Sequence, residues 1–371
     1  MLRFLTAGES HGRNLTAIIE GLPAGLSLPL DELNGALERR QAGYGRGGRQ
    51  QIEHDQVRVT GGLADGVTTG APLALMIENR DWANWAGRSV PAWTRPRPGH
   101  ADWAGAVKYG LSDLRQVAER ASARETAARV AVGAVASALL RAVGVTLGSY
   151  VEAIGGEHAL VDALTLEERL TLARASDVAS PDAEAAARMR ARIDAARGAG
   201  DSLGGLIVLA ALGVPVGLGS YVHWDRRLDA RIAAAVMSIP AVKGVEIGPA
   251  FANTELAGTQ VHDALYLGCG RPERRSNRAG GLEGGVSNGQ PIVVRAAVKP
   301  IPTTVTAQPT VDLATGEAAA TQYQLSDVCA VPAAAVVGEA MLAWVLAEAL
   351  LERYGGDSIP TLQRRVSDDR G

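Results

Sequence analysis

Cysteine is almost absent from this chain of 371 residues, which contains only Cys269 and Cys329. Two cysteines so far apart have no spacing typical of a zinc or iron–sulfur site, so we expect no metal centre. So few cysteines fit a reducing compartment, in which both would be small core side chains. The cytoplasm is therefore the expected location.

Aromatic residues and long apolar runs are also scarce. Aromatic side chains make up 4 % of the chain and apolar ones 47 %, so Ala, Val, Leu and Ile must fill the core. No apolar run reaches the roughly 18 residues of a membrane span, and residues 1–12 do not resemble a signal peptide. A net charge of −3 provides no general attraction to nucleic acid or membranes, so we expect neither as a partner.

Three sequence patterns occur twice and in the same order, which predicts an internal duplication. The pairs are 8–12 (GESHG) with 200–204 (GDSLG), 21–26 (GLPAGL) with 213–218 (GVPVGL), and 62–72 with 281–291. Each half then runs into a long helix rich in Ala, Val and Leu, near 122–144 and 332–354. We predict one domain, 1–371, made of halves of about 1–150 and 200–371. A charged helical segment, about 151–199, joins them.

The secondary-structure pattern favours an α+β fold. Short apolar runs bounded by Gly or Pro predict strands at 15–19, 73–77, 206–211 and 292–297. The stretch 122–140 is apolar nearly all round, which is typical of a buried helix. A charged helix is expected to be capped at 180–182 and to end at Gly198. Strands and buried helices in a duplicated chain indicate stacked layers of sheet and helix.

The duplication provides an internal comparison for His11. The turn 8–12 should share its backbone with 200–204, yet His11 corresponds to Leu203. A single histidine at a turn is usually structural or simply exposed. Because the copy accepts an apolar residue, we interpret His11 as retained for chemistry.

The same comparison singles out an arginine cluster within 39–49. Three of its members correspond to residues without charge: Arg39, Arg40 and Arg46 face Met237, Ser238 and Gly244. Arg49 completes the cluster, and the glycines around it leave few other side chains. A solvated basic loop is the simpler alternative. Since guanidinium groups bind carboxylates and phosphates in bidentate fashion, we favour a site for a small polyanion.

Four further segments carry candidate groups. A rigid turn, 97–102 (RPGHAD), presents His100. The segment 120–126 (RASARET) opens the buried helix, where backbone N–H groups favour an anion, although an ordinary capping box of Ser122 and Glu125 is also compatible. The loop 299–304 (KPIPTT) offers a cation and hydroxyls, and composition alone makes Asp327 a helix cap.

Five motifs in order resemble those of the chorismate synthase family: 8–12, 97–102, 120–126, 276–281 (SNRAGG) and 299–304. The resemblance covers essentially the whole chain. It implies a β-α-β-α sandwich that forms a homotetramer and binds reduced FMN. It also implies a 1,4-elimination of phosphate from 5-enolpyruvylshikimate 3-phosphate, giving chorismate without net redox change. NADPH or another external reductant, with an external flavin reductase as a partner, would serve only to reduce the flavin.

The resemblance assigns roles to individual positions. His11 is similar to the acid that protonates the departing phosphate, with Ser10 and Ser122 beside it. His100 is similar to the histidine near flavin N1, and Asp327 to the carboxylate near flavin N5 that helps accept the substrate proton. The positions matching substrate or NADP binding are Arg40, Arg46, Arg49 and Arg124. Those matching flavin contacts are Arg120, Ala121, Ser122, Pro240, Ala241, Gly284, Lys299, Pro300, Ile301, Pro302 and Thr303.

One position departs from the family pattern. Leu325 stands two residues before Asp327, where the family generally has arginine. This leaves open a flavin-binding homologue with weakened or lost catalysis. A flavin-independent hydrolase that uses His11 and the arginines, and a purely structural duplicated scaffold, are further alternatives. The one-sided distribution of His and Arg makes the scaffold the weakest of these.

Overall fold

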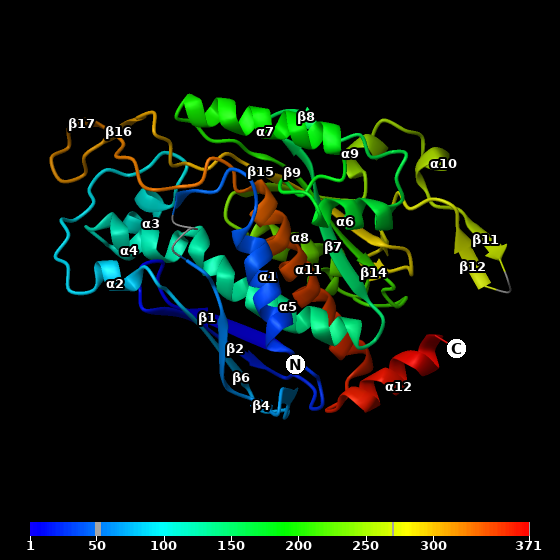
Figure 1. The fold of residues 1–371 in the computed structure, drawn as a ribbon. Coiled ribbons are helices and arrows are strands. Elements are labelled where there is room, and N and C mark those ends of the chain that lie inside the picture. Colours follow the sequence, from blue (N-terminus) through cyan, green and yellow to red (C-terminus); the bar gives the residue numbers. More distant parts are fainter. Residues whose placement is uncertain (49–52, 269–270, 371) are drawn as a thin grey trace.

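The computed structural model describes residues 1–48, 53–268 and 271–370, and a mixture of helices and two main antiparallel sheets forms its body (Figure 1). The first sheet has the order β1-β2-β6-β3. Its strands are β1 (Arg3–Ala7), β2 (Asn14–Glu20), β6 (Leu73–Glu78) and β3 (Val57–Gly61). Alternate residues of β6, Leu73, Leu75 and Ile77, are buried, as expected for strands with one face against a core.

The second sheet has the order β10-β15-β9-β7-β8. Its strands are β10 (Val242–Ile247), β15 (Ile292–Val298), β9 (Gly205–Leu212), β7 (Thr146–Ile154) and β8 (Glu157–His158). Apolar residues lie on both of its faces: Ile207 and Leu209 belong to the main core, whereas Val208 packs with Leu170 of α6 (Leu166–Arg174). Helices therefore cover both sides of this sheet.

Four helices fill the space between the sheets: α1 (Leu30–Gln41), α5 (Thr126–Arg141), α8 (Leu228–Met237) and α11 (Val331–Tyr354). The helix α5 packs on the first sheet and α11 on the second, and the two helices pack on each other at the centre (Figure 1). Their approach is close, because a Cβ added to Gly133 would lie 2.2 Å from the Cβ of Ala340.

Corresponding elements follow one another in the same order in both sheets. The strand–helix–strand series β2, α1, β3 is matched by β9, α8, β10, and β6 followed by α5 is matched by β15 followed by α11. Each sheet also has one small hairpin at the matching place, β4 (Leu63–Ala64) with β5 (Val67–Thr68) and β13 (Leu282–Glu283) with β14 (Val286–Ser287). This correspondence supports the predicted duplication.

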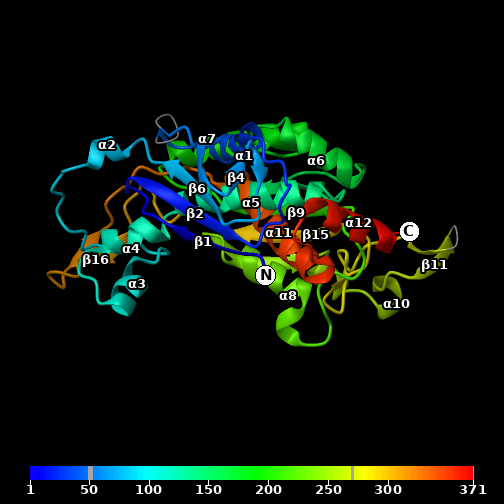
Figure 2. The same ribbon diagram turned by 90° about the horizontal axis from the view of Figure 1, so that it is seen from below.

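The remaining elements lie around this body. They are α2 (Trp82–Trp85), α3 (Asp102–Tyr109), α4 (Leu114–Ala121), the 3-10 turns η2 (Ala123–Glu125) and η3 (Trp224–Arg226), α7 (Ala183–Gly198), α9 (Ala250–Asn253), α10 (Gly258–Val261), β11 (Leu265–Gly268), β12 (Arg271–Arg274), β16 (Pro309–Val311), β17 (Ala318–Ala320) and α12 (Ile359–Arg370). The hairpin β11–β12 extends away from the body in both views (Figures 1 and 2).

The four strands expected at 15–19, 73–77, 206–211 and 292–297 are confirmed as β2, β6, β9 and β15. The charged helix α7 begins after its cap Asp182 and ends at Gly198, as expected. Two boundaries differ. The joining segment begins as strand, because residues up to Ile154 complete β7, where β-branched and aromatic side chains favour extended backbone. The long helix starts at Thr126 and not at Ser122, because η2 intervenes.

Within the described residues, α11 is the one helix long and apolar enough to cross a membrane. Its most apolar stretch is 83 % buried inside the protein, and Glu339 and Glu348 interrupt its apolar sequence. The length and apolarity of α11 are therefore those of a core helix. Cys329, just before it, is fully buried, as expected; Cys269 lies outside the described residues.

Candidate active site

The turn 8–12 lies against the end of α4. Asn79 fixes the turn, because its side-chain amide donates to the carbonyls of Glu9 (3.1 Å) and Gly12 (2.6 Å). Gly8 has a φ of 108°, and a Cβ there would lie 2.3 Å from the carbonyl oxygen of Asn14. Glycine is therefore required where the chain leaves β1.

This turn brings the predicted acid next to both predicted serines. The hydroxyl of Ser10 donates to that of Ser122 over 3.2 Å. His11 Nδ1 lies 2.7 Å from Glu119 Oε1, and the backbone N–H of His11 donates to Glu119 Oε2 over 2.6 Å. The His11 and Glu119 side chains are 27 % and 24 % exposed, so a ligand has access to them.

Ser122 also shapes the start of the buried helix. Its hydroxyl accepts a hydrogen bond from the backbone N–H of Arg124 and so caps η2. The predicted capping box with Glu125 is not formed, because Glu125 pairs with Arg129 one turn further along the helix. Since α4 ends and η2 begins at Ser122, this residue links the two helical segments that carry Glu119 and Arg124.

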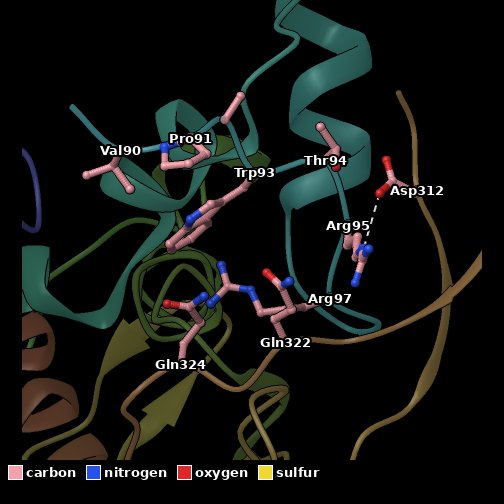
Figure 3. A pocket seen from close by; sticks show the side chains of 10 residues that line it. Val90, Pro91, Trp93, Thr94, Arg95, Arg97, Asp312, Gln322 and Gln324 are labelled. Carbon is pink, nitrogen blue, oxygen red and sulfur yellow. Dashed lines mark hydrogen bonds and ion pairs between the residues drawn. The ribbon is translucent and has the colours of Figure 1, made fainter. Parts of the chain in front are cut away.

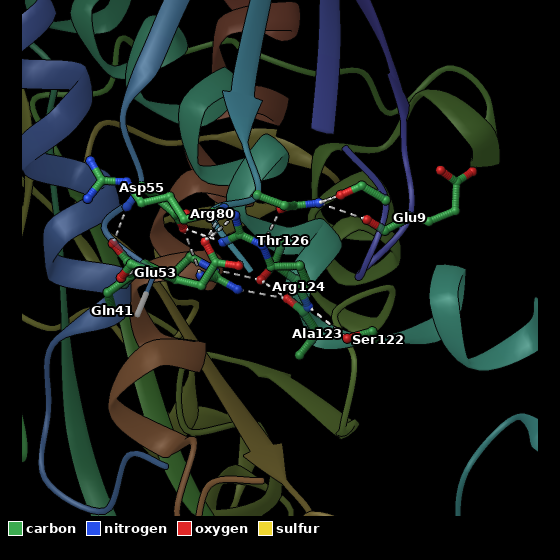
Figure 4. Close-up of polar contacts among 12 residues, drawn as sticks. Glu9, Gln41, Glu53, Asp55, Arg80, Ser122, Ala123, Arg124 and Thr126 are labelled. Carbon is green, nitrogen blue, oxygen red and sulfur yellow. Dashed lines mark hydrogen bonds and ion pairs between the residues drawn. The ribbon is translucent and has the colours of Figure 1, made fainter. Parts of the chain in front are cut away.

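Two predicted arginines, Arg40 and Arg124, are buried, and Figure 4 labels Arg124 beside Asp55. Arg124 donates to Asp55 Oδ2 (2.6 Å) and to Asn79 Oδ1 (2.9 Å). Arg40 donates to Thr126 Oγ1 and to the carbonyl oxygen of Ala123, both over 2.9 Å. Burial lowers the pKa of Arg40 to about 10, and the nearby Asp55 carboxylate offsets part of that effect. The Arg40 guanidinium is therefore still cationic at neutral pH.

Arg46 and Asp327 join the two halves of the chain at this site. Arg46 Nη1 lies 2.7 Å from Asp327 Oδ2, and the backbone N–H of Gly47 donates to Asp327 Oδ1 over 2.6 Å. The helix α11 begins after Ala330, which provides no side-chain cap. The interpretation of Asp327 as a helix cap is therefore wrong, since its carboxylate binds the arginine loop.

Several buried polar atoms in this region have no hydrogen-bond partner within the described residues: Arg46 Nε, Arg124 Nη2 and Asp55 Oδ1. Arg124 Nη2 does lie 3.7 Å from Glu53 Oε2, which is an electrostatic contact beyond hydrogen-bonding distance. Unsatisfied guanidinium donors are costly when buried. They fit a site in which an anionic ligand provides the missing acceptors.

His100 is held in a second cluster. Its Nδ1 lies 2.6 Å from Asp102 Oδ1, and Arg97 contacts both oxygens of the same carboxylate, at 2.8 and 3.0 Å. Burial raises the pKa of Asp102, but the hydrogen bonds from His100 and Arg97 outweigh it and hold the pKa well below its ordinary value. Because the carboxylate stays ionised and accepts hydrogen bonds only, His100 Nδ1 carries the hydrogen.

The loop 299–303 packs against the His100 turn. Lys299 Nζ donates to the carbonyl oxygen of Gly99 (2.9 Å), and its backbone N–H donates to that of Ala241 (2.9 Å). Burial, together with the positive charge of Lys243, lowers the pKa of Lys299. Thr303 is buried, and the Ser202 hydroxyl donates to the carbonyl of Ile301. Lys299 and Ala241 are therefore in direct contact with each other.

A cavity of about 330 Å³ opens beside this cluster (Figure 3). Trp93, Arg97, Gln322 and Gln324 line it, and Arg97 lies over the Trp93 ring at 5.8 Å from the ring centre. It therefore borders the His100 turn on the side of the segment that contains Leu325.

Some predicted residues do not join these clusters. Gly284 lies in the hairpin at the start of α8, where Gly285 accepts from Leu228, whereas Ala241 follows the end of that helix. The two residues therefore lie near opposite ends of α8. Arg120, in contrast, is exposed but does contact the first cluster, since it donates to the backbone carbonyls of Thr6 and of Gly8 in the turn 8–12. Arg49 lies outside the described residues.

Several site residues were missed from the sequence: Glu53, Asp55, Asn79 and Glu119. Their partners lie dozens of residues away, so no local spacing indicates them. Glu119 alone had a local indication, as it directly precedes 120–126. In the described segments, no group of three or more His, Cys, Asp or Glu side chains is arranged to hold a metal ion.

Fold and site together define a layered protein of helices and antiparallel sheets with a small-molecule site rich in guanidinium and imidazole groups. The sequence model of the family described as chorismate synthase matches residues 2–351. The chain therefore belongs to the chorismate synthase family and is a lyase of the shikimate pathway, which leads to the aromatic amino acids.

Individual relatives agree over nearly the full length. A chorismate synthase of Moorella thermoacetica is 53 % identical, with 99 % of this chain and 98 % of that protein covered. One of Geobacter sulfurreducens is 52 % identical, with 98 % and 97 % covered. A crystal structure of a chorismate synthase superposes with a TM-score of 0.82 at 45 % identity, and it covers 99 % of this chain and 96 % of that one.

Proposed function

We propose that this chain converts 5-enolpyruvylshikimate 3-phosphate to chorismate by 1,4-elimination of phosphate, with reduced FMN as cofactor. The observation that carries the proposal is the pair of buried guanidinium donors, Arg46 Nε and Arg124 Nη2, that have no acceptor among the described residues. Arg124 is linked to the His11 turn through Asn79. A substrate with two carboxylates and a phosphate provides many oxygen acceptors. Arg40, Arg46 and Arg124 bind it, because guanidinium groups form strong charge-assisted hydrogen bonds with such oxygens.

The residues of the second cluster fit reduced FMN. Lys299 is partly buried with its charged form disfavoured, and a phosphate or anionic ring beside it would offset that cost. The residues that would hold the cofactor are Lys299, Pro300, Ile301, Pro302, Thr303, Pro240 and Ala241, together with Arg120, Ala121 and Ser122 from the end of α4. Gly284 rests on the family resemblance alone. When bound, reduced FMN supplies electron density that helps a poor leaving group depart, without net redox change.

Three titratable side chains have separate roles in proton transfer and charge balance. His11 donates a proton to the departing phosphate, and the hydrogen-bonded pair of Ser10 and Ser122 stabilises the phosphate oxygens. His100, held by Asp102, balances negative charge on the cofactor side. Asp327, which pairs with Arg46, helps accept the proton that leaves the substrate.

The wider setting follows from the same resemblance. The enzyme is a cytoplasmic homotetramer, and NADPH or another external reductant, through an external flavin reductase, reduces its flavin. The hairpin β11–β12 carries exposed apolar side chains, Leu265 and Leu267 at 60 % and 84 % exposure. These side chains support an oligomer, because exposed apolar groups are typical of protein interfaces. The chain is an internally duplicated β-α-β-α sandwich, which the matching element order supports.

An anaerobic phosphate-release assay with reduced FMN tests this function. We expect wild-type turnover, a loss of about 100-fold or more in His11→Ala, and a clear loss in His100→Ala. His158→Ala, which changes an exposed side chain in β8, is the control and should retain full rate. Full turnover in both site variants would show that the assigned proton roles are wrong. Flavin binding without phosphate release would favour the non-catalytic homologue, and release without flavin would favour a hydrolase.

A further inference from the structure

The carboxylate of Glu119 is hydrogen-bonded to both the side chain and the main chain of His11. Glu119 Oε1 lies 2.7 Å from His11 Nδ1, while Glu119 Oε2 accepts from the backbone N–H of His11 over 2.6 Å. The carbonyl of Glu119 also accepts from the backbone N–H of Ser10 over 2.9 Å. One residue of α4 therefore binds two successive residues of the turn 8–12.

This arrangement selects one tautomer of the imidazole. An ionised carboxylate only accepts hydrogen bonds, so His11 Nδ1 must carry a hydrogen. Proton exchange with a substrate then takes place at Nε2. A carboxylate that fixes imidazole tautomer and orientation in this way contributes strongly to catalysis in other enzymes.

The second half of the chain shows that the fold does not require the carboxylate. Leu203 occupies the position of His11 there, and its backbone N–H donates to the carbonyl oxygen of Val328 over 2.9 Å. Where the side chain is apolar, a main-chain acceptor therefore suffices. The Glu119 carboxylate is therefore present where the turn carries a histidine, and the turn itself does not need it.

We infer that Glu119 is a positioning residue for His11, and this inference rests on the proposed function. As the substrate C–O bond breaks, its electron pair goes to the phosphate oxygen, which takes the proton from His11 Nε2. The electrons of the substrate C–H bond that also breaks complete the new double bond, and that proton leaves with the help of Asp327. His11 is left neutral with its hydrogen on Nδ1, held by Glu119. The substitution Glu119→Gln removes the preference for the Nδ1–H tautomer of His11. An amide has one acceptor oxygen and cannot replace both carboxylate oxygens, which accept from His11 Nδ1 and from the backbone N–H of His11.

Nitrogen NMR of the ligand-free protein, labelled with ¹⁵N-histidine, tests the tautomer directly. The His11 signals, assigned with His11→Ala, should show Nδ1–H and unprotonated Nε2 in the neutral form of the wild type. In Glu119→Gln we expect a tautomer mixture. Glu9→Gln, which removes a charge from an exposed side chain of the same turn, should match the wild type. Identical His11 spectra in wild type and Glu119→Gln would overturn the inference, whether or not the chain releases phosphate.

Kinetics separates positioning from a general structural effect. Glu119→Gln should lower kcat about 10- to 100-fold with KM changed less than about threefold, because substrate contacts remain. In the His11→Ala background the same substitution should have no further effect. An equal loss in both backgrounds, or a kcat within about twofold of wild type, would contradict the proposed role. If Glu119→Gln does not fold, Glu119→Asp, which keeps the charge but shortens the reach, is judged by the same criteria.

Discussion

At the residue scale, Leu325 is the position at which this chain departs from its family. Its side chain is 66 % exposed, and a Cβ on Gly48 would lie 3.9 Å from it. It therefore borders the loop that carries Arg46. Removing a buried charge partner costs about 2–5 kcal/mol, and an exposed position reduces this effect through solvent screening.

We therefore expect Leu325→Arg to tighten binding of the substrate or of reduced FMN about tenfold, which corresponds to about 1.4 kcal/mol. Anaerobic titration with each ligand measures this. Tyr323→Arg, which adds the same charge at a half-exposed position two residues away, should have little effect. Unchanged or weaker affinity for both ligands in Leu325→Arg would count against a site for negatively charged ligands here.

Single residues could be proposed for chemistry where the two similar halves of the sequence allowed a comparison. His11 and the arginines stood out because Leu203, Met237 and Ser238 replace them in the copy. Asp55 and Glu119 had no such comparison, and their partners come together only through tertiary packing. An acidic residue that pairs with a distant cation has the same local sequence as one that faces solvent.

At the element scale, the crossing of α5 and α11 positions the site, because η2 and Arg124 lead directly into α5. The crossing depends on Gly133, where a Cβ would lie 2.2 Å from Ala340 Cβ and 2.4 Å from Ala340 Cα. A glycine inside a helix is normally less stable than alanine by about 1 kcal/mol. Here close packing outweighs that preference.

Gly133→Ala should therefore destabilise the protein by about 1–3 kcal/mol, since the backbone of α11 must move away. Gly35→Ala is the matched control, because a Cβ at Gly35 in α1 meets no atom within 4 Å. It should stabilise the protein by about 0.5–1 kcal/mol. Urea unfolding of the two variants beside wild type measures both effects. Stabilisation by both substitutions would show that the two helices are not in contact at this point.

Apolar pattern identified the strands and the buried helices, but it could not place their ends. Residues 122–125 (SARE) contain no glycine or proline that would separate them from the helix that follows, and only the hydrogen bond from the backbone N–H of Arg124 to the Ser122 hydroxyl shows that a 3-10 turn precedes it. Residues 151–154 were assigned to a helical segment because charged residues follow them. Pairing with β9 decides that they are strand.

At the scale of the whole molecule, the site forms where the two halves meet. Arg46 belongs to the first half and Asp327 to the second, and the 299–303 loop of the second half packs on the His100 turn of the first. The sequence indicated Arg46, Asp327 and the 299–303 loop as candidate site residues, but their contacts depend on how the halves pack on each other. A second contact between the halves, in which a buried glutamate of α11 takes part, holds this arrangement together.

That contact is the ion pair of Arg39 in α1 with Glu339 in α11. Arg39 donates to both carboxylate oxygens, at 3.0 and 2.8 Å, and the Ser149 hydroxyl of β7 donates to one of them at 3.1 Å. Burial raises the pKa of Glu339, but the hydrogen bonds from Arg39 and Ser149 outweigh it, so the pKa lies below the ordinary 4.5. A carboxyl whose pKa is lower in the folded state stabilises the fold above about pH 4.5, and this contribution is lost as the pH falls through the folded-state pKa.

Glu339→Gln should therefore lower the free energy of unfolding at pH 7 by about 1–3 kcal/mol, a moderate figure because Arg39 is 36 % exposed and keeps part of its hydration. As the pH falls below about 4.5, the wild type loses its advantage and the two proteins converge. Denaturant unfolding at pH 7 and at successively lower pH measures the difference. Glu167→Gln, at an exposed position of α6, should follow the wild type throughout. A difference between wild type and Glu339→Gln that stays constant across this range would mean that packing, and not the charge of Glu339, joins the halves at this point.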